Sequence, residues 1–516
     1  MRPFLLSLTA IAVACFAAVL PVQAAYHGLE EIPVESRTIR DIEDVAATYG
    51  LGAAFHTTRP WTRANLAAFL QEIVALAPQA EGDPAVARLR RELAPESGGW
   101  QPLVHVQDDQ GSLEVSPYLS ADFAENRARR SVVRDFRGGV QTSALLGGNV
   151  LFFTDMFVGN QSPGPHGNPV GSRTFGLIEG VVVNPYFDRA YVRGGGPRGT
   201  VTLGHSWLRW GPGVTGGVGL SDGSQAFDFV EFRTRLLRRL QLEWFLASLD
   251  PLAESYLAGH RIEVRPVASV DLALAELVRF DGVANVPLYL VPVIPYSMIE
   301  RRLINSSGLA TDSLQWAFRN NVMWTADVTW RARSGTRLYG EIAVDNLSFS
   351  SQKRPLAIAW QTGVHTRWRQ DGGALSARGE YSRVYRYTYT SLVHRHDFVF
   401  NGLPTGYPLG PDAEQFFGQL AWSRGADWTF TLEGALARRG KAVLGDAWVV
   451  GTPVPPLALS GVVEQDARIA AAVDWSPAAG LTLGVTAGDA RVRARDHVAD
   501  HDASGFYGAM RCRVRW

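Results

Sequence analysis

Apolar and polar residues alternate along most of this chain, from about residue 112 to its last residue. In one stretch Val322, Trp324 and Val328 fall on one side of the alternation, and Thr325 and Asp327 fall on the other. A period of two is that of a β-strand whose two faces meet different surroundings. A soluble β-sandwich shows the same alternation, so the number of strands and the lengths of their connections have to decide the fold.

The alternation predicts an antiparallel, mainly β protein with about 18 strands, most of them roughly ten residues long. The expected strands lie near 112–125, 132–145, 148–158, 185–194, 198–207, 226–234, 238–247, 259–266, 269–277, 320–331, 335–345, 356–369, 373–388, 413–424, 427–438, 465–475, 480–494 and 504–516. An even number of strands of this length is typical of a transmembrane β-barrel in the bacterial outer membrane.

The connections between these strands sort by length in step with strand number. Connections after even-numbered strands are short and rich in turn residues, such as Gly195-Gly196-Pro197 and Gln370-Asp371-Gly372. Connections after odd-numbered strands include the long segments 159–184, 208–225, 278–319, 389–412 and 439–464. Outer-membrane barrels have short periplasmic turns and long external loops, whereas a sandwich has no reason to sort its loops in this way.

The first residues are typical of an export signal. Arg2 precedes the apolar run Phe4–Leu20, and small residues lead to a cleavage site expected after Ala24. No later apolar run is long enough for a spanning helix, so an exported form that enters a membrane must be a barrel. We predict a signal peptide at 1–24, a periplasmic helical segment at 25–111 and the outer-membrane β-barrel at 112–516.

The segment before the first strand is expected to form a small α-helical bundle. Ser36, Thr62 and Asp83-Pro84 are helix-start signals, and apolar residues follow each of them at intervals of three and four. Because the segment precedes a strand that rises from the short-turn side, the bundle is expected in the periplasm.

The last strand alternates as far as the end, with Phe506, Met510, Val514 and Trp516 on its apolar face. A final strand of this kind resembles the signal that the barrel assembly machinery recognises, and its apolar face is expected to contact outer-membrane lipid. Cys512 is the one cysteine outside the predicted signal peptide, so no intrachain disulfide is expected. Lys+Arg and Asp+Glu are equal at 50 each, which gives no case for a nucleic-acid partner.

One loop motif joins aromatic residues to a rigid turn. Trp207, Arg209 and Trp210 precede Gly211-Pro212-Gly213, and Leu220-Ser221-Asp222 follows. Flat indole faces suit the C–H side of a sugar ring, and Arg209 suits an acidic glycan. The alternative interpretation is an aromatic belt residue followed by a tight turn.

A second motif lies in the long loop 389–412. His394, Arg395 and His396 come first, and Tyr407 and Asp412 follow in a stretch rich in glycine and proline. Tyr407 offers an aromatic face, Asp412 can accept hydrogen bonds from hydroxyl pairs, and Arg395 suits an acidic group. Two histidines without a third ligand are a weak metal signal, so no metal and no cofactor are predicted. The alternative for both motifs is that they only set the shape of their loops.

With these motifs the chain resembles the capsule assembly Wzi family of outer-membrane proteins. Trp210-Gly211-Pro212-Gly213 with Leu220-Ser221-Asp222 is similar to one family signature, and Gly406-Tyr407-Pro408-Leu409-Gly410 with Asp412 is similar to another. Arg59-Pro60-Trp61-Thr62 resembles the N-terminal segment of the family. The likeness runs in the same order over nearly the whole mature chain. Leu208-Arg209-Trp210 departs from it, because the family has adjacent tryptophans there.

The resemblance implies an 18-stranded barrel with a periplasmic helical bundle, which binds capsular or other surface polysaccharide at the cell exterior. We therefore expect an outer-membrane protein that binds such a polysaccharide and supports its assembly or attachment at the cell surface. The candidate contacts are Trp207, Arg209, Trp210, Arg395, Tyr407 and Asp412.

Two other functions are weighed against this one. A barrel of about 18 strands is wide enough for a porin-like diffusion channel. Charges of both signs on the lumen face, such as Arg337, Arg378, Glu341 and Glu380, could line such a pore or fill it, and loop 278–319 is long enough to fold inward as a plug. A hydrolase is not expected, because no Gly-x-Ser-x-Gly elbow is recognised, and no catalytic residues are assigned.

Overall fold

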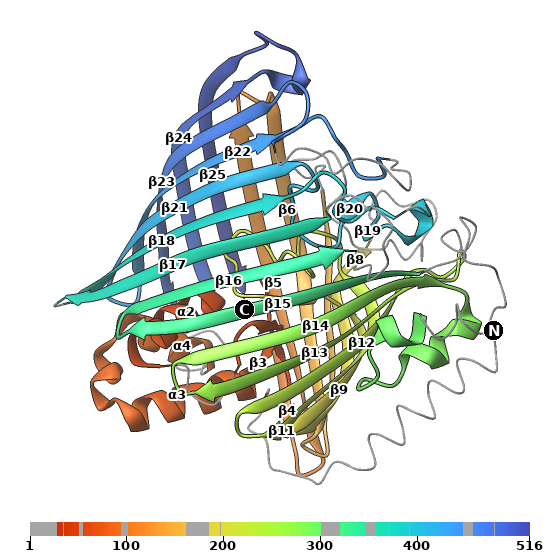
Figure 1. Ribbon diagram of the computed structural model, residues 1–516. Helices are drawn as coiled ribbons and strands as arrows, with labels where there is room; N and C mark the ends of the chain where they lie inside the picture. The colour runs from red at the N-terminus through yellow and green to blue at the C-terminus, as the bar shows by residue number, and fades with distance from the viewer. Residues whose placement is uncertain are drawn as a thin grey trace.

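The fold is a closed antiparallel barrel with helices at one end (Figure 1). Residues 28–34, 36–50, 55–93, 102–160, 185–196, 198–300, 320–345, 357–370, 372–391, 393–446, 458–478 and 480–515 are described by the computed structural model. The predicted signal peptide at 1–24 and the terminal Trp516 lie outside these residues.

The barrel has 18 strands, as the alternation predicts. They are β5 (Gly111–Asn126), β6 (Ser131–Leu146), β7 (Val150–Asn160), β8 (Pro185–Gly196), β9 (Gly199–Ser206), β11 (Phe227–Leu237), β12 (Leu240–Asp250), β13 (Ser255–Val267), β14 (Val270–Asp281), β15 (Asn321–Arg333), β16 (Thr336–Asp345), β17 (Ile358–Gln370), β18 (Gly373–Val384), β21 (Ala413–Arg424), β22 (Trp428–Arg439), β23 (Glu464–Ala478), β24 (Leu481–Arg493) and β25 (Ala503–Arg515). Neighbours pair in chain order, and β25 closes the barrel against β5 from Tyr507↔Asn126 to Arg515↔Tyr118. A short strand, β4 (Val104–Gln107), pairs antiparallel with the first residues of β5 and forms a hairpin with them.

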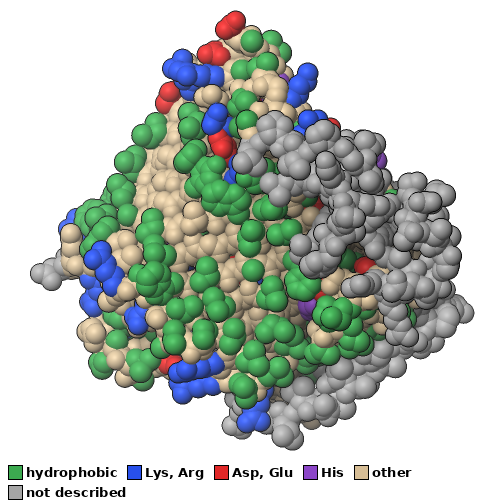
Figure 2. Space-filling model, in the orientation of Figure 1, with side chains coloured by type: hydrophobic (Ala, Val, Ile, Leu, Met, Phe, Trp, Pro, Cys, Tyr) green, Lys and Arg blue, Asp and Glu red, His purple; other side chains and the backbone are tan. Residues whose placement is uncertain are grey.

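The two faces of the wall differ as the alternation requires. Outward side chains such as Phe136, Leu274 and Met510 are exposed, whereas inward ones such as Arg261 and Glu243 are buried. Figure 2 shows the outward hydrophobic side chains spread over the wall in view, with charged side chains gathered toward its upper and lower edges. An apolar band between polar edges is the surface that a bilayer requires of a barrel.

The connections divide the barrel into two ends. Those at one end are short, for example 334–335 between β15 and β16 and 371–372 between β17 and β18. Those at the other end include 207–226, 385–412 and 440–463. We call these the short-turn end and the long-loop end. The predicted sorting of connections is therefore present in the fold.

The predicted helices cover the short-turn end. They are α2 (Arg37–Tyr49), α3 (Arg63–Leu76), whose capping box pairs Thr62 with Asn65, and α4 (Pro84–Leu93), with the 3-10 turn η1 (Pro78–Gly82) between α3 and α4. Gly335 N donates to Ala47 O at 2.9 Å, and Arg91 Nη1 donates to Ser476 O at 2.6 Å. The bundle is thus fixed to the barrel turns. Among the described residues, no helix is long and apolar enough to cross a membrane.

Two chain segments enter the lumen and meet there. Strand β2 (Thr58–Arg59), which lies between α2 and α3, pairs with β10 (Arg209–Trp210) in the connection between β9 and β11. The expectation that loop 278–319 could plug the barrel is wrong for its described part. Residues 282–300, including the 3-10 turn η3 (Val283–Tyr289), pack on outward side chains of β12–β14.

Candidate functional site

The connection 207–226 folds into the barrel, and we call it the luminal loop. Its two arms are joined by the hydrogen bond from Trp210 N to Leu220 O, 3.0 Å, and Gly211 N donates to Thr57 O at 2.9 Å. Inward carboxylates of the wall accept from its backbone. Val214 N is 2.6 Å from Glu380 Oε2, and Val218 N is 3.1 Å from Glu341 Oε1. Hydrogen bonds from the loop backbone to two buried carboxyl groups of the wall therefore join the luminal loop to the barrel.

Trp210 packs against the inner wall of the barrel. Its indole Nε1 donates to Glu243 at 2.9 Å, and its ring meets Phe245 edge-on with 5.3 Å between centroids. Only 1% of Trp210 is exposed. Gly259 lies beneath the indole, where an added Cβ would come within 2.7 Å of it. In this arrangement Trp210 offers no surface to a sugar; it fixes the luminal loop to the wall.

Arg209 ties together the two halves of the first motif. Its Nη1 is 3.0 Å from Asp222 Oδ1, and its Nη2 donates to Gly213 O. Both charged side chains are buried. Because its two terminal NH2 groups are directed at Asp222 and Gly213, this guanidinium holds the turn in shape, and an acidic glycan would have to displace those partners to reach them.

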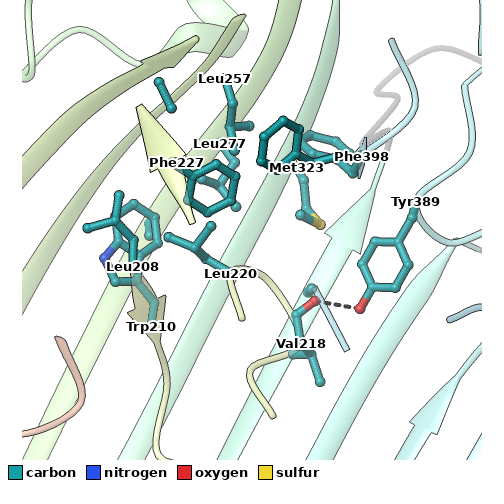
Figure 3. Packing of buried hydrophobic residues seen from close by; sticks show 14 of the residues in the cluster. Leu208, Trp210, Val218, Leu220, Phe227, Leu257, Leu277, Met323, Tyr389 and Phe398 are labelled. Atoms are coloured by element: carbon teal, nitrogen blue, oxygen red, sulfur yellow. Dashed lines mark hydrogen bonds between the residues drawn. The ribbon is translucent and has the colours of Figure 1, made fainter. Parts of the chain in front are cut away.

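The second motif packs directly on the first. Tyr407, 1% exposed, donates its hydroxyl to Gln415 Oε1 at 2.6 Å, and Thr215 Oγ1 lies 2.8 Å from the same hydroxyl. Ser221 N donates to Thr405 O at 2.7 Å. Tyr389 bridges the two loops. Its hydroxyl donates to Val218 O at 2.7 Å (Figure 3) and accepts from Tyr407 N. Motifs almost two hundred residues apart thus form one packed unit.

Asp412 is also committed to protein contacts. It has a positive φ of 55° and is buried. Its carboxylate accepts from the backbone N–H groups of Ala442, 3.3 Å away, and Ser460, 3.2 Å away. The residue therefore joins the end of loop 385–412 to the two ends of loop 440–463.

Trp207 and Arg395 are the sequence-predicted candidates that keep accessible surface. Trp207 is half-buried, and 64% of the Arg395 side chain is exposed. Arg395 Nε and His396 Nε2 both lie near Asp281 Oδ2, at 2.8 and 3.1 Å, whereas His394 faces Asp397. The two histidines thus approach different carboxylates. Among the residues that the structure describes, no group of three or more metal-ligating side chains is found.

Asp397 stands out electrostatically in this loop. Burial raises the pKa of its carboxyl to about 6, although the backbone N–H of Ser391 and the His394 ring act in the opposite direction. The charge of Asp397 at the long-loop end is therefore sensitive to mildly acidic pH.

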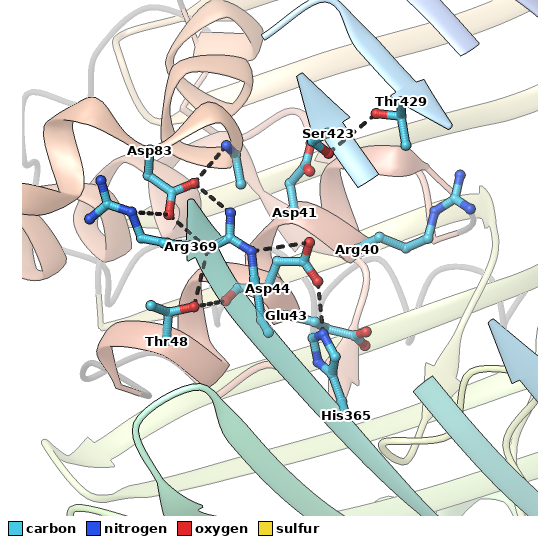
Figure 4. Close-up of polar contacts among 12 residues, drawn as sticks. Arg40, Asp41, Glu43, Asp44, Thr48, Asp83, His365, Arg369, Ser423 and Thr429 are labelled. Atoms are coloured by element: carbon cyan, nitrogen blue, oxygen red, sulfur yellow. Dashed lines mark hydrogen bonds and ion pairs between the residues drawn. The ribbon is translucent and has the colours of Figure 1, made fainter. Parts of the chain in front are cut away.

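The helices contribute an acidic cluster that meets arginines of the wall. Arg378 reaches both Glu43 and Asp44 at 2.8 Å. His365 Nε2 is 2.9 Å from Asp44, and Figure 4 shows these two side chains facing each other. Arg59 of β2 is 2.6 Å from Glu43. Burial opposes ionisation of Glu43 and Asp44, yet the surrounding guanidinium groups outweigh it and hold the pKa of each carboxyl below its usual range.

The lumen is filled unevenly. Along β11–β18 the inward charged side chains, such as Arg261, Arg337 and Glu341, are buried under the luminal loop and segment 55–62. Along β25 and β5, however, the inward pair Arg511 and Asp122 keeps 64% and 41% exposure. One half of the interior is thus a packed core, and the other half is reached by solvent.

Sequence reasoning missed the residues that join the motifs. Tyr389 and Thr405 lie in the predicted long loop, but nothing in their spacing indicates contacts to Val218 and Ser221. The inward placement of Glu341 and Glu380 is confirmed, whereas their partners, backbone N–H groups of a loop, leave no residue-type signal. The signal in the sequence that could have pointed to such a joining residue is an aromatic side chain, such as Tyr389, within one of the long loops.

Comparisons with known proteins address the fold. No family model matches the chain, and no curated protein matches it in sequence. The solved barrels of OprD and of OpdK with vanillate, both from Pseudomonas aeruginosa, superpose with TM-scores of 0.42 and 0.43 at 9% identity. They cover 81% and 78% of this chain, and 97% and 98% of their own.

A further solved structure covers more of the chain. It is Wzi, an outer-membrane protein involved in group 1 capsule assembly in Escherichia coli and a carbohydrate-binding β-barrel. It matches with a TM-score of 0.61 at 13% identity, over 93% of this chain and 98% of its own. In fold, the chain therefore resembles the Wzi capsule-assembly barrel, as its loop motifs predict.

Proposed function

We propose that the protein binds surface or capsular polysaccharide at its long-loop end and supports the assembly or attachment of that polysaccharide at the cell surface. The observation that carries the proposal is the packed unit formed by the luminal loop and loop 385–412, which supplies a fixed base for a binding surface. Likeness of fold to a carbohydrate-binding barrel supports the same assignment. The proposal is one of binding, without catalysis, metal or cofactor.

We assign the candidate residues to two roles within this proposal. Trp207 and Arg395 contact the glycan, since their side chains are accessible. A half-exposed indole supplies apolar area at small entropic cost, and a guanidinium pairs with acidic groups. Arg209, Trp210, Tyr407 and Asp412 act on binding indirectly, because they hold the loops beneath. The proposal places the long loops outside the cell and the helices in the periplasm.

A deletion strain that carries plasmid-borne variants tests the contact role. Trp207→Ala and Arg395→Ala should reduce the polysaccharide retained on cells, while the amount of heat-modifiable barrel stays unchanged. Arg127→Ala is a matched control, because the Arg127 side chain is also 64% exposed and lies at the tip between β5 and β6. Normal retention in both test variants would contradict the assigned contacts.

A diffusion channel is the second candidate function, and the exposed inward pair of Arg511 and Asp122 favours it. Planar-bilayer recordings on the purified full chain separate the two functions. A protein devoted to glycan binding should show no steady single-channel steps, because the helices cover the short-turn end and the luminal loop fills part of the lumen. Regular steps of porin size would favour the channel.

A further inference from the structure

A polar pair lies on the outward face of the barrel wall. Trp244, His260, Glu276 and Trp324 are successive cross-strand partners on β12, β13, β14 and β15. All belong to the outward set, because the residues next to Glu276 in sequence, Ala275 and Leu277, belong to the luminal core. An imidazole and a carboxylate facing acyl chains would be costly.

Residues 282–300, which we call the outer flap, cover this pair. Tyr296 N and Ser297 N donate to the Glu276 carboxylate at 2.6 and 2.8 Å, and His260 Nε2 lies 3.3 Å from it. The Tyr296 ring also lies over His260, with 4.3 Å between centroids. Trp244 Nε1 donates to Tyr289 O at 2.9 Å. Glu276 is fully buried, and its hydrogen bonds fasten the outer flap to the wall.

The outer flap lies at the depth of the apolar belt. Outward positions on β14 run from Leu272 and Leu274, which are exposed, to Val278 and Phe280, which are buried beneath the outer flap. Eight residues of a tilted strand climb roughly 20 Å along the barrel axis, and the lipid-facing band of such barrels is about 25 Å tall. In Figure 1 the helical turns of this segment lie beside β12.

The exposed side of the outer flap is apolar. No Asp, Glu, Lys or Arg occurs from Gly282 to Ile299. Val293 is 71% and Met298 65% exposed, and Leu288, Val291 and Ile294 are exposed as well. In a loop surrounded by water, exposed apolar side chains would be interspersed with charged ones rather than form a continuous apolar surface.

We propose that the outer flap is a lipid-contacting surface, which replaces the strands as the membrane-facing wall over β12–β14. Its partner is the acyl chains of the leaflet at the long-loop end. Continuity with the neighbouring belt residues Ile262 and Leu274, both exposed on the same sector, identifies this partner. The outer flap buries the polar pair, presents apolar side chains in its place and thickens the barrel on one side.

Fluorescence quenching on the full-length barrel in liposomes tests the proposal. Val293→Cys in a Cys512→Ser background is labelled with a small fluorophore and reconstituted into phosphatidylcholine or its brominated form. The label should lose as much intensity in brominated lipid as one at Leu274→Cys in the belt. A label at Asp500→Cys, an exposed position in the connection between β24 and β25, should lose none.

Two outcomes overturn the proposal, and both are read on the heat-modifiable fraction so that misfolded protein does not contribute. If the label at position 293 is not quenched by brominated lipid but is quenched by aqueous iodide, the outer flap lies in water. If the label at position 293 is shielded from both quenchers, and this shielding disappears as the protein is diluted in lipid, the partner of the outer flap is a second copy of the chain.

Discussion

Single buried side chains determine whether the long loops keep their shape, and Trp210 is the clearest example. Trp210→Ala should remove the contacts with Phe245 and leave Glu243 without its indole donor. Large-to-small changes at such sites cost about 3–5 kcal/mol. We expect the heat-modifiability transition of the purified barrel to shift to lower temperature. Trp207→Ala should leave the transition unchanged, and an equal shift in both variants would show that Trp210 is no more of an anchor than Trp207.

Substituting a motif glycine by alanine also tests how tightly the loops are packed, because it adds a Cβ atom. At Gly213 an added Cβ would overlap Gly216 O and the end of the Gln361 side chain. Gly213→Ala should therefore disturb the luminal loop and raise its cleavage by protease added to whole cells. Gly418→Ala on β21 is the control, because nothing lies within 4 Å of its added Cβ. Unchanged cleavage of the Gly213 variant would mean that Gln361 and the loop adjust freely.

At the scale of elements, ion pairs fix the helices to the barrel and make this attachment sensitive to acid. Burial disfavours the charged forms, but arginines lower the pKa of Glu43, Asp44 and Asp83 below ordinary values of 4.5, 3.8 and 3.8. A depressed pKa in the folded state contributes stability above the ordinary pKa, and this contribution is lost as pH falls through the folded value.

The attachment should therefore be stable at neutral pH and weaken below about pH 4. Thermal unfolding followed by tryptophan fluorescence across this range measures the effect. Glu43→Gln should lower stability at pH 7 by roughly 3–5 kcal/mol, because it leaves buried arginines without a charged partner, and it should flatten the acid response. Glu81→Gln removes an exposed pair with Arg90 and is the control. A response to acid that is the same in all three proteins would contradict this account.

The elements themselves could be predicted from the sequence, because alternation and capping are local signals. All 18 strands and the helices after Ser36, Thr62 and Asp83 lie close to their expected positions. The expected strand 373–388 ends earlier, at Val384, where Tyr385 N donates to Ile358 O and the chain turns. Strand β4 was missed, since four residues show too little alternation to be recognised.

The site was less accessible to sequence reasoning. Composition and loop length place Trp210 and Tyr407 in long loops, but whether such a loop folds inward depends on distant partners. Here those partners are Thr57, Glu243 and Tyr389. The same limitation applies to the inward plug considered for loop 278–319. Its residues 282–300 pack instead on the outward face of the wall, where backbone N–H groups donate to Glu276.

For the whole molecule, we expect the helices to determine whether the barrel conducts ions. Removal of residues 25–111 should still allow the barrel to insert, since wall arginines such as Arg378 would be solvated by water. The truncated barrel should conduct ions in planar bilayers, whereas the full chain should not. A truncation that inserts without conducting would show that the loops alone close the lumen; one that fails to insert would show that barrel assembly depends on the helices.

The pairing of β2 with β10 also links the two ends of the barrel mechanically. Glu43 of α2 holds Arg59, β2 is hydrogen-bonded to β10, and the luminal loop holds loop 385–412 through Tyr389. No long flexible spacer interrupts this path among the described residues. A force applied to the helices on one side of the membrane is therefore transmitted as strain to the loops on the other side. A force applied to the loops is transmitted to the helices along the same contacts.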